Sequence, residues 1–573
     1  MDFKLLEASL GKRPCDLIIR NCKIVDVFSC SSFESNIGIY GGIIAGFGDL
    51  DGKKEIDAEG RTIAPGFFDG HVHIESSMVE PAEFARAAVV NGTTSIVADP
   101  HEIANVLGLE GLRYMLDSSA NLPLNIFFML PSCVPSTDLE TSGSRLYAED
   151  LKLFLERDCV LGLGEVMNYH SLLMGSKKLM EELETFKSKR IDGHAPKLSG
   201  KELDAYCASG IESDHECVSA DEAEEKLRKG LRIMIREGSA ARNMKALLPM
   251  VEKAQTDRFI LVTDDISALD LQRGYMNRVL SKAVSLGIKP EAAIRMATLN
   301  TCEYFRIEGL GAIAPGYRAD LVILKDTRDF EPEMVIKDGL VIAESKRLLI
   351  PIKKREADVR ATVNVKKMTP RSFDIKFKAT DTKSENINVI SLMRDEIETE
   401  WIRERAKVLE GSAVSDTESD ILKVCVVERH RATGRVGKGF VRGFSLKSGA
   451  IASSVAHDSH NIIVVGADDR DMHRALEAVS AYGGGLVVVD KGKVLGALRL
   501  PIGGLMSDRS IEEVSESMQN INEHVASLGC ELDEPFMTLS FLTVPVIPKL
   551  RVTDMGLIDV SRQKRISLFT ESS

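Results

Sequence analysis

Two histidines separated by one residue follow a short apolar run, in the stretch Pro65-Gly-Phe-Phe-Asp-Gly-His71-Val-His73. The apolar run predicts a buried strand, and side chains alternate between the two faces of an extended chain. His71 and His73 are therefore expected to point to the same side, where two imidazoles can hold one divalent metal ion. An accidental pair of histidines at the start of a loop is the alternative if no other residue fits such a site.

The distribution of the other histidines favours the metal site. The chain has 11 histidines, of which six lie between positions 71 and 215, and none follows before His430. Residues spread over this length can form one site only if the fold brings them together. The elements that carry them therefore decide whether the site exists.

Eight short apolar stretches alternate with stretches of helical spacing between residues 64 and 305. Alternating strands and helices predict a parallel sheet, and eight units in close to ~250 residues favour closure into a (β/α)₈ barrel over an open sheet. The fifth stretch has the weakest strand pattern. The predicted strands are 67–74, 93–99, 124–130, 159–166, 190–194, 210–215, 231–235 and 259–264.

Polar residues gather at the carboxyl ends of these predicted strands, which is where the chemistry of such barrels takes place. Any one of them could instead cap a helix or lie hydrogen-bonded at the surface. Together they offer nitrogen and carboxylate ligands without thiolate, a set that suits two ions of Zn²⁺, Fe²⁺ or Mn²⁺. The residues are His71, His73, Asp99, His101, Glu102, Glu165, His194, His215, Asp264 and Asp265.

A pair of metal ions that share a carboxylate lowers the pKa of bound water, which supplies hydroxide at neutral pH. A neighbouring carboxylate can take the proton and pass it to a leaving group. Asp264 is predicted to have this role, because it is the first carboxylate to emerge from the strand 259–264. Strand alternation then turns Asp265 away from the metal ions, toward Ser267 or a neighbouring side chain.

Short strands broken by glycine lie on both sides of the predicted barrel. Residues 1–63 and 306–352 are therefore predicted to form one small β-sandwich domain, into which the barrel of residues 64–305 is inserted. The composition changes after the barrel, and residues 353–573 are predicted to form a carboxyl-terminal α+β domain. Within it, the sequence His457-Asp-Ser-His460 is either a structural turn or reaches the mouth of the barrel.

The composition excludes several classes of partner. With 86 acidic and 73 basic residues the formal net charge is −13, which argues against nucleic acid or an anionic membrane as the main partner. The ten cysteines include no Cys-x-x-Cys pair, a pattern typical of reduced thiols. Neither a signal peptide nor an apolar run of ~20 residues is visible. We expect a cytoplasmic protein that acts on a small molecule.

The chain combines several motifs at the predicted strand ends and in the β-domain. The His71-Val-His73 start, the split β-domain with Ala314-Pro-Gly-Tyr-Arg-Ala-Asp-Leu-Val322 and the aspartate on the eighth strand together resemble the amidohydrolase superfamily. Six narrower motifs are His73-Ile-Glu-Ser-Ser77, Ala98-Asp-Pro-His-Glu102, Gly162-Leu-Gly-Glu-Val-Met-Asn168, Asp192-Gly-His-Ala-Pro196, Ser213-Asp-His-Glu216 and Val262-Thr-Asp-Asp265. Within the superfamily these motifs resemble the bacterial and archaeal adenine deaminases, and the resemblance covers essentially the whole chain.

The resemblance implies hydrolytic deamination of adenine to hypoxanthine and ammonia in purine salvage, by a homodimer with two divalent metal ions per site, Mn²⁺ or Fe²⁺ before Zn²⁺. It implies that His71, His73 and Asp264 hold one ion and His194 and His215 the other. Glu165 would bridge them, where many superfamily members have a lysine. Asp99 and Glu102 match acidic positions that either bind a further metal weakly or transfer a proton to the substrate. The implied substrate pocket contains Glu75, Ser76, His101, Asn168 and Asp265.

Two other functions remain open from the sequence. A cyclic-amide hydrolase, as in the hydantoinase-like and dihydroorotase-like relatives, shares the barrel and the His-x-His pair but more often has the bridging lysine. An inactive barrel that serves as a binding subunit should lack metal ligands, and none is missing here. Because the resemblance is to enzymes that act on free bases, adenine is expected to be a better substrate than adenosine.

Overall fold

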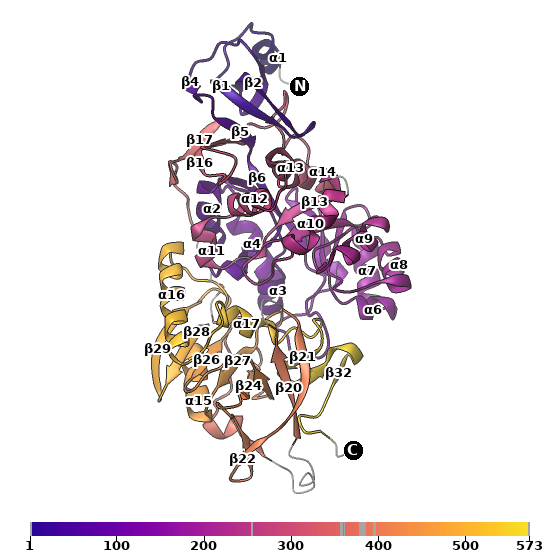
Figure 1. The fold of residues 1–573 in the computed structure, drawn as a ribbon, viewed down its shortest axis with the longest axis vertical. Coiled ribbons are helices and arrows are strands. Elements are labelled where there is room, and N and C mark those ends of the chain that lie inside the picture. The colour runs from indigo at the N-terminus through magenta and orange to yellow at the C-terminus, as the bar shows by residue number, and fades with distance from the viewer. Residues whose placement is uncertain are drawn as a thin grey trace.

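The computed structural model describes residues 3–253, 256–355, 359, 361–376, 386–393 and 397–570. Three parts follow one another along its long axis, with a β-domain at one end, a barrel in the middle and a carboxyl-terminal domain at the other end (Figure 1). Among the helices of these residues, none combines the length and the hydropathy that a bilayer span requires.

The β-domain is built from both sides of the barrel. Strand β5 (Thr62–Pro65) pairs antiparallel with β15 (Leu321–Leu324), which joins the two segments into one hydrogen-bonded sheet. The aliphatic side chains between them, such as Ile63 and Ile323, form a separate buried core. The other elements are α1 (Phe3–Ser9), β1 (Leu17–Asp26), β2 (Ser31–Tyr40), β3 (Ile43–Phe47), β4 (Glu55–Asp57), β16 (Pro332–Lys337), β17 (Leu340–Glu344) and β18 (Arg347–Leu348).

The middle part is the predicted (β/α)₈ barrel. Its strands pair in parallel in the order β10-β9-β8-β7-β6-β14 and β11-β12-β13. The backbone N–H of Glu212 donates to the carbonyl of Ile191 at 3.0 Å, which joins β11 to β10. The strands are β6 (Phe67–His73), β7 (Thr93–Ala98), β8 (Asn125–Leu130), β9 (Val160–Val166), β10 (Arg190–Gly193), β11 (Ser213–Asp214), β12 (Arg232–Arg236), β13 (Phe259–Val262) and β14 (Asp264–Asp265).

Two predicted strands differ from the structure. The sixth is reduced to two residues, because Gly210, with φ of 94°, still belongs to the turn that ends the preceding helix. The eighth is interrupted at Thr263, so that β13 pairs with β12 while β14 pairs with β6. Asp264 has φ of 63°, in the left-handed region, and the regular alternation of side chains is therefore broken at this residue.

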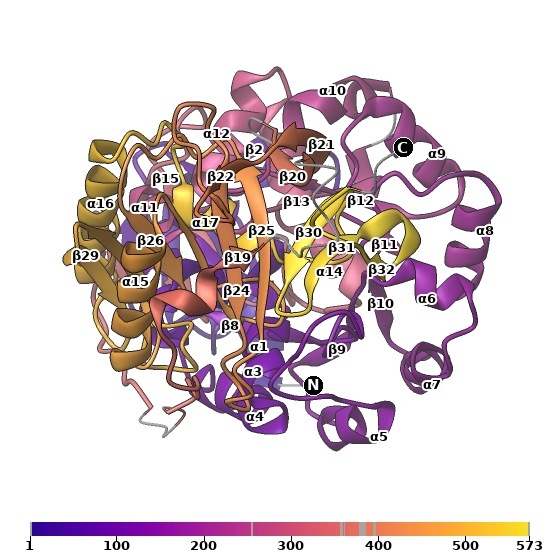
Figure 2. The ribbon, with the colours of Figure 1, turned by 90° about the horizontal axis from the view of Figure 1, so that it is seen from below.

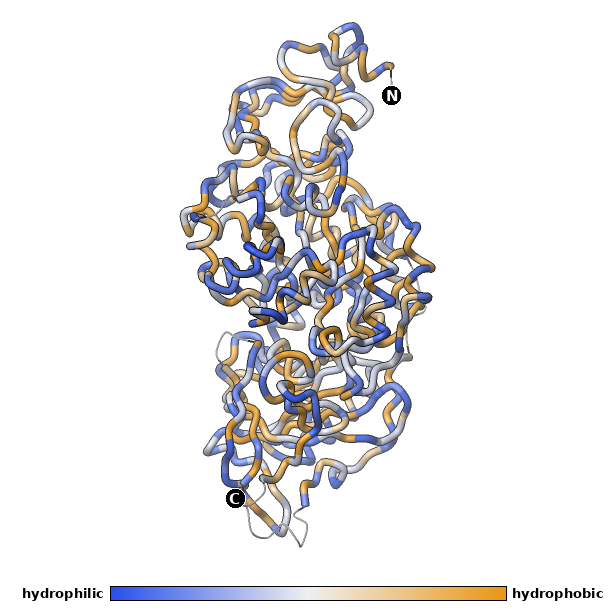
Figure 3. The backbone as a smooth tube through the Cα atoms, turned by 90° about the vertical axis from the view of Figure 1, so that its right-hand side faces the viewer, coloured by the Kyte–Doolittle hydropathy of each residue, from blue (hydrophilic) through white to orange (hydrophobic). Residues whose placement is uncertain are grey.

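Helices cover the barrel and place their apolar side chains against it. Serine residues cap several of them; the Ser219 side chain, for example, accepts a hydrogen bond from the Glu222 amide. Apolar and polar residues alternate along the chain trace (Figure 3). The helices are α2 (Pro81–Val90), α3 (His101–Leu107), α4 (Leu109–Ser118), α5 (Ala148–Leu151), α6 (Tyr169–Leu173), α7 (Lys177–Phe186), α8 (Gly200–Ala208), α9 (Ala220–Arg228), α10 (Met244–Lys253), α11 (Ala268–Arg273), α12 (Met276–Ser285), α13 (Pro290–Met296) and α14 (Leu299–Phe305).

The carboxyl-terminal domain is α+β, with an eight-stranded sheet of order β21-β20-β25-β24-β27-β26-β28-β29. Its strands are β20 (Asn386–Leu392), β21 (Thr399–Arg405), β24 (Leu422–Val427), β25 (Val436–Arg442), β26 (Ala450–Ser453), β27 (Ile462–Gly466), β28 (Gly485–Asp490) and β29 (Lys493–Arg499). Two small sheets accompany it, made of β19 (Ile375–Lys376), β22 (Lys407–Leu409) and β23 (Ser412–Val414), and of β30 (Leu550–Thr553), β31 (Gly556–Asp559) and β32 (Lys564–Arg565). Its helices are α15 (Asp469–Ala481), α16 (Ile511–Ser527) and α17 (Pro535–Phe541).

This domain packs against one end of the barrel, and in the view from below it lies in front of the barrel strands (Figure 2). Helix α16 contacts the barrel, where Ser515 Oγ donates to the carbonyl of Ala268 at 3.0 Å. Arg86 of α2 and Glu512 of α16 form a salt bridge, with 2.8 Å between Nη1 and Oε1. The carboxyl-terminal domain is therefore placed to complete a site at this end.

Candidate active site

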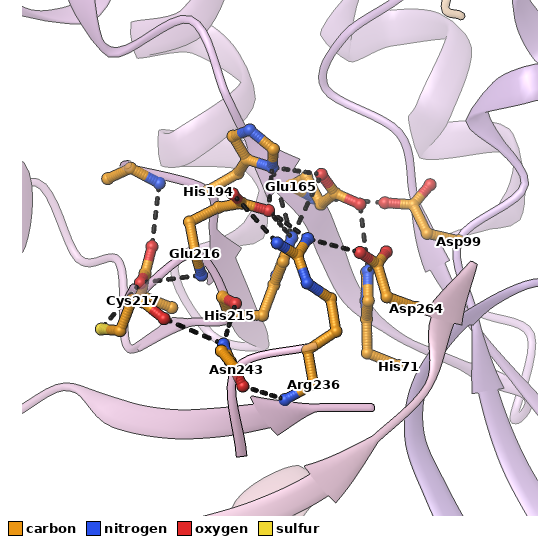
Figure 4. Close-up of polar contacts among 12 residues, drawn as sticks. His71, Asp99, Glu165, His194, His215, Glu216, Cys217, Arg236, Asn243 and Asp264 are labelled. Atoms are coloured by element: carbon orange, nitrogen blue, oxygen red, sulfur yellow. Dashed lines mark hydrogen bonds and ion pairs between the residues drawn. The ribbon is translucent and has the colours of Figure 1, made fainter. Parts of the chain in front are cut away.

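Glu165, at the end of β9, lies between two pairs of histidines, of which Figure 4 labels His71 on one side and His194 and His215 on the other. Its Oε1 atom is 3.0 Å from His71 Nε2 and 2.9 Å from His73 Nε2. Its Oε2 atom is 3.0 Å from His194 Nδ1 and 3.7 Å from His215 Nε2. All five side chains are buried. Burial opposes ionisation, but the surrounding imidazoles hold the pKa of Glu165 well below its ordinary value.

Asp264 joins the first pair of histidines. Its Oδ1 atom is 3.3 Å from His71 Nε2 and 3.1 Å from His73 Nε2. Its Oδ2 atom accepts a hydrogen bond from Arg236 Nη1 at 2.6 Å. Although burial raises its pKa, Arg236 and the two histidines hold the pKa of Asp264 well below the ordinary value, so the carboxylate is ionised at neutral pH.

These residues fit a divalent cation. His71 Nε2, Glu165 Oε1 and His194 Nε2 are buried without a hydrogen-bond partner among the described residues, which is costly unless another group binds them. His73 Nδ1 is 2.9 Å from the carbonyl oxygen of Asp99 and donates to it, which leaves the lone pair on Nε2 toward the cluster. Ligand atoms of His71, Glu165, His215 and Asp264 all lie within 4.8 Å of one another.

Asp99 and His101, two of the three residues expected after the second strand, lie on one side of this cluster. Asp99 Oδ2 accepts the backbone N–H of Glu165 at 3.2 Å, which orients the end of β9. Asp99 Oδ1 is 3.4 Å from His101 Nδ1. His101 lines the cavity that opens above the cluster.

Glu102 binds two histidines of the carboxyl-terminal domain. Its two carboxylate oxygens receive short hydrogen bonds from His457 Nδ1 and His460 Nε2. His460 Nδ1 accepts the amide proton of Ala456 at 3.1 Å, so the neutral His460 ring carries its proton on Nε2 and donates it to Glu102. Burial lowers the pKa of His460 to about 4, whereas Glu102, against the effect of burial, raises that of His457 to about 9. The segment 457–460 therefore reaches the mouth of the barrel and is not only a structural turn.

Arg236 and Glu216 also line the cavity, although the sequence did not predict either of them as a site residue. Arg236 ends β12 and bridges Asp264 and Glu216, with 3.3 Å between its Nη2 atom and Glu216 Oε2. Glu216 Oε1 is 3.4 Å from His215 Nε2 and 3.6 Å from His194 Nδ1. Glu216 belongs to the motif Ser213-Asp-His-Glu216, so a signal for it was present.

The cavity is lined by both domains. Its barrel side consists of His73, His101, Glu102, Glu165, Met167, His194, His215, Glu216, Arg236, Ala241, Asp264 and Asp265. The opposite side comes from the carboxyl-terminal domain, with Ile397, His457, Asp458, Phe541, Val544 and Ile547. The sequence did not predict the residues that the carboxyl-terminal domain contributes, apart from the open alternative for 457–460.

Arg551 holds the apolar part of this wall in place. Its buried guanidinium donates to the carbonyl oxygens of Ile547 at 2.8 Å, Phe541 at 3.0 Å and Ile397 at 2.7 Å. The Phe541 ring also stacks on the imidazole of His457, with 4.7 Å between the ring centroids. The apolar wall is thus a fixed surface against which a planar ligand can pack.

The structure places the other predicted pocket residues as follows. Asp265 lines the cavity beside Asp264 instead of turning away from it, because the positive φ of Asp264 breaks the alternation. Ser76 does not line the cavity, and its hydroxyl donates to Asp265. Glu75 Oε1 accepts the amide of Ile103 at 3.2 Å, and Asn168 caps α6. Neither of these two side chains lines the cavity, since each is bound to the backbone of a neighbouring helix.

A buried ion pair supports the two loops that carry His194 and His215. Lys226 Nζ donates to Asp214 Oδ2 at 2.9 Å and to the carbonyl of Ala195 at 2.7 Å. Asp214 Oδ1 in turn accepts the amide of Ala195 at 2.8 Å. Both charged side chains are fully buried. The pair therefore fixes the positions of the residues next to the two histidines.

We expect Lys226→Met to lower the free energy of unfolding by about 3–5 kcal/mol, because Asp214 would be left as a buried charge without its cation. Urea unfolding measures this change. Lys229→Met is the matched control: its ammonium pairs with Asp204 at the surface, and little change is expected. An equal loss in both variants would contradict the special role of Lys226.

The pH dependence of the free energy of unfolding is a second measurement of the Lys226–Asp214 pair. Burial would raise the pKa of Asp214, but Lys226 holds it at about 2 in the folded protein. A lowered folded-state pKa gives stability that is fully present above the unfolded value of ~3.9 and is lost as the pH falls toward 2. This contribution to the acid limb of the stability profile should disappear in Lys226→Met.

Comparison with known proteins identifies the family to which the chain belongs. Residues 62–342 match the model of the amidohydrolase family, and residues 396–564 match that of the adenine deaminase C-terminal domain. The chain is 47% identical to adenine deaminase 2 of Carboxydothermus hydrogenoformans, over 97% of each chain. It is 45% identical to adenine deaminase of Methanothrix thermoacetophila, over 99% of each chain.

Among solved structures, a crystal structure of enamidase, described as a member of the amidohydrolase superfamily, aligns with a TM-score of 0.45 at 21% identity. The alignment covers 59% of this chain and 98% of that one. The matches to adenine deaminases extend over nearly the full length of both chains and include both domains that line the cavity. The chain therefore belongs to the adenine deaminase family within the amidohydrolase superfamily.

Proposed function

We propose that this protein hydrolyses adenine to hypoxanthine and ammonia. The observation that carries the proposal is Glu165, whose two oxygens face two separate histidine pairs, next to the ionised Asp264. The relatives that share both domains are named adenine deaminases. One water molecule adds to the amino-bearing carbon of the base, and the amino group leaves as ammonia.

The residues around Glu165 would hold two divalent metal ions. His71, His73 and Asp264 surround one position, His194 and His215 surround the other, and Glu165 lies between them. The nitrogen and carboxylate ligands would accept Mn²⁺, Fe²⁺ or Zn²⁺, and Mn²⁺ or Fe²⁺ is proposed before Zn²⁺ on the resemblance to the adenine deaminases. Bound there, the cations would supply a hydrolytic water at neutral pH by lowering its pKa.

The protein's own residues would move the protons. Asp264 has one oxygen toward the histidines and the other on Arg236, which keeps it ionised and fixes its orientation. It is therefore placed to accept the proton of the attacking water and to donate it to the leaving amino group. Asp99 acts through its hydrogen bond to the Glu165 amide and is a positioning residue.

The test is turnover by the purified full-length protein after loading with Mn²⁺, Fe²⁺ or Zn²⁺ in turn. We expect formation of hypoxanthine and release of ammonia in equal amounts from adenine, and much slower reaction with adenosine. Hydantoin and dihydroorotate are the comparison substrates, and turnover of either in place of adenine would favour a cyclic-amide hydrolase. Metal-loaded protein that is inactive on all four would favour a binding subunit.

The remaining sequence predictions concern the cellular setting. A role in purine salvage, a cytoplasmic location and assembly into a homodimer stay predictions. Sedimentation of the purified protein would measure the oligomeric state.

A further inference from the structure

One acidic residue in the cavity has a carboxylate oxygen to which no described group of the protein donates a hydrogen bond. Asp458, on the segment between β26 and β27, is only 3% exposed, and its Oδ2 atom has no hydrogen-bond partner in the part of the chain that the structure describes. The other oxygen, Asp458 Oδ1, is 3.8 Å from His101 Nε2. This separation is too long for a hydrogen bond. A carboxylate buried in this way is costly unless a ligand satisfies it.

The other carboxylates that line the same cavity are each bound by the protein. Glu102 is held by two histidines, Asp264 and Glu216 by Arg236, and Asp265 by Ser76. Glu165 faces the four histidines of the cluster. Asp458 is thus the lining carboxylate that remains available to bind a substrate.

The position of Asp458 indicates which part of the substrate it meets. The reacting carbon of adenine is on the six-membered ring and must approach Glu165 and Asp264 at the end of the barrel. The five-membered ring then points toward the wall that the carboxyl-terminal domain provides. Asp458 lines the same cavity as Phe541, Val544 and Ile547, which offer an apolar surface for the planar base, and its carboxylate lies near His101 and Glu102.

We propose that Asp458 is a specificity-determining residue that accepts a hydrogen bond from the N–H of the five-membered ring of the free base. The inference rests on the proposed deamination of adenine. A carboxylate accepts but does not donate, and the free base has one ring N–H, on N9 or N7. Adenosine and 9-methyladenine have no such N–H. A site whose buried polar group is left unpaired by the analogue rejects that analogue strongly.

The experiment compares the metal-loaded wild type with Asp458→Ala and Asp458→Asn. We expect Asp458→Ala to raise KM for adenine and Kd for hypoxanthine by ~10- to 100-fold, the factor for one hydrogen bond to a charged group, with metal content unchanged. The preference for adenine over 9-methyladenine should shrink by at least ~10-fold. Asp458→Asn keeps an acceptor oxygen and should restore most of the affinity.

Asp468→Asn is the matched control. Asp468 is exposed and its side chain caps the amino end of α15, a role that an asparagine side chain can also take. Unchanged KM, Kd and substrate preference in Asp458→Ala would overturn the inference. So would a fall in kcat alone that Asp458→Asn does not restore, because Asp458 would then act in proton transfer. Failure of the wild type to turn over adenine would contradict the proposed function as well.

Discussion

Replacing Glu165 by glutamine is expected to lower adenine turnover by ~100-fold or more and to reduce the content of bound metal. Loss of a residue that only orients a metal ligand already costs ~10- to 100-fold, and Glu165 contacts both histidine pairs itself. Glutamine has the same shape but one neutral acceptor oxygen, so it cannot serve two cations equally. Turnover and metal analysis of the same preparation measure both effects.

Glu182→Gln is the control for this variant. Glu182 is also a buried glutamate of the barrel, on α7, but its carboxylate pairs with Lys178 at 3.2 Å away from the cavity. Its replacement is expected to leave turnover and metal content unchanged. A Glu165→Gln variant with normal turnover and full metal content would refute the bridging position.

Replacing Asp264 by asparagine is expected to lower kcat by ~100- to 10,000-fold, the range for loss of general acid–base help. Asparagine can still accept the hydrogen bond from Arg236, but it cannot carry a proton between water and the leaving group. The measurements are kcat over a range of pH and the metal content. Persistence of the wild-type pH profile in the remaining activity would contradict the shuttle role.

Asp265→Asn is the matched comparison, since both carboxylates line the cavity. Asp265 accepts a hydrogen bond from Ser76, whereas the ion pairs of His71 and His73 with an aspartate are made by Asp264, so the loss of Asp265 should cost less than that of Asp264. Should Asp265→Asn be inactive while Asp264→Asn keeps its activity, the proton shuttle would be Asp265.

Most of the barrel side of the site could be predicted from the chain itself. His71, His73, Glu165 and the residues after later strands were expected together, because parallel strands joined by helices place all their carboxyl ends at one edge. Hydrophobic periodicity and strand length are local properties of the sequence, so each βα unit can be predicted without reference to the others. The structure brings these side chains to within hydrogen-bonding distance or close to it.

Details of the same edge could not be predicted. Asp265 was expected to turn away, but the left-handed backbone at Asp264 keeps both carboxylates in the cavity. Arg236 directly follows the predicted strand 231–235, yet a cation at a strand end does not suggest a metal site. Its role depends on Glu216 and Asp264, which belong to other strands.

By itself, the sequence determined the barrel, its insertion in a β-domain and the residues at the ends of its strands. Only the tertiary structure decided how the cavity is closed. Glu102 meets His457 and His460 across 355 and 358 residues of chain, and Asp458 enters the same cavity. Such contacts depend on how two separately formed surfaces fit together, and no local periodicity of either segment encodes that fit.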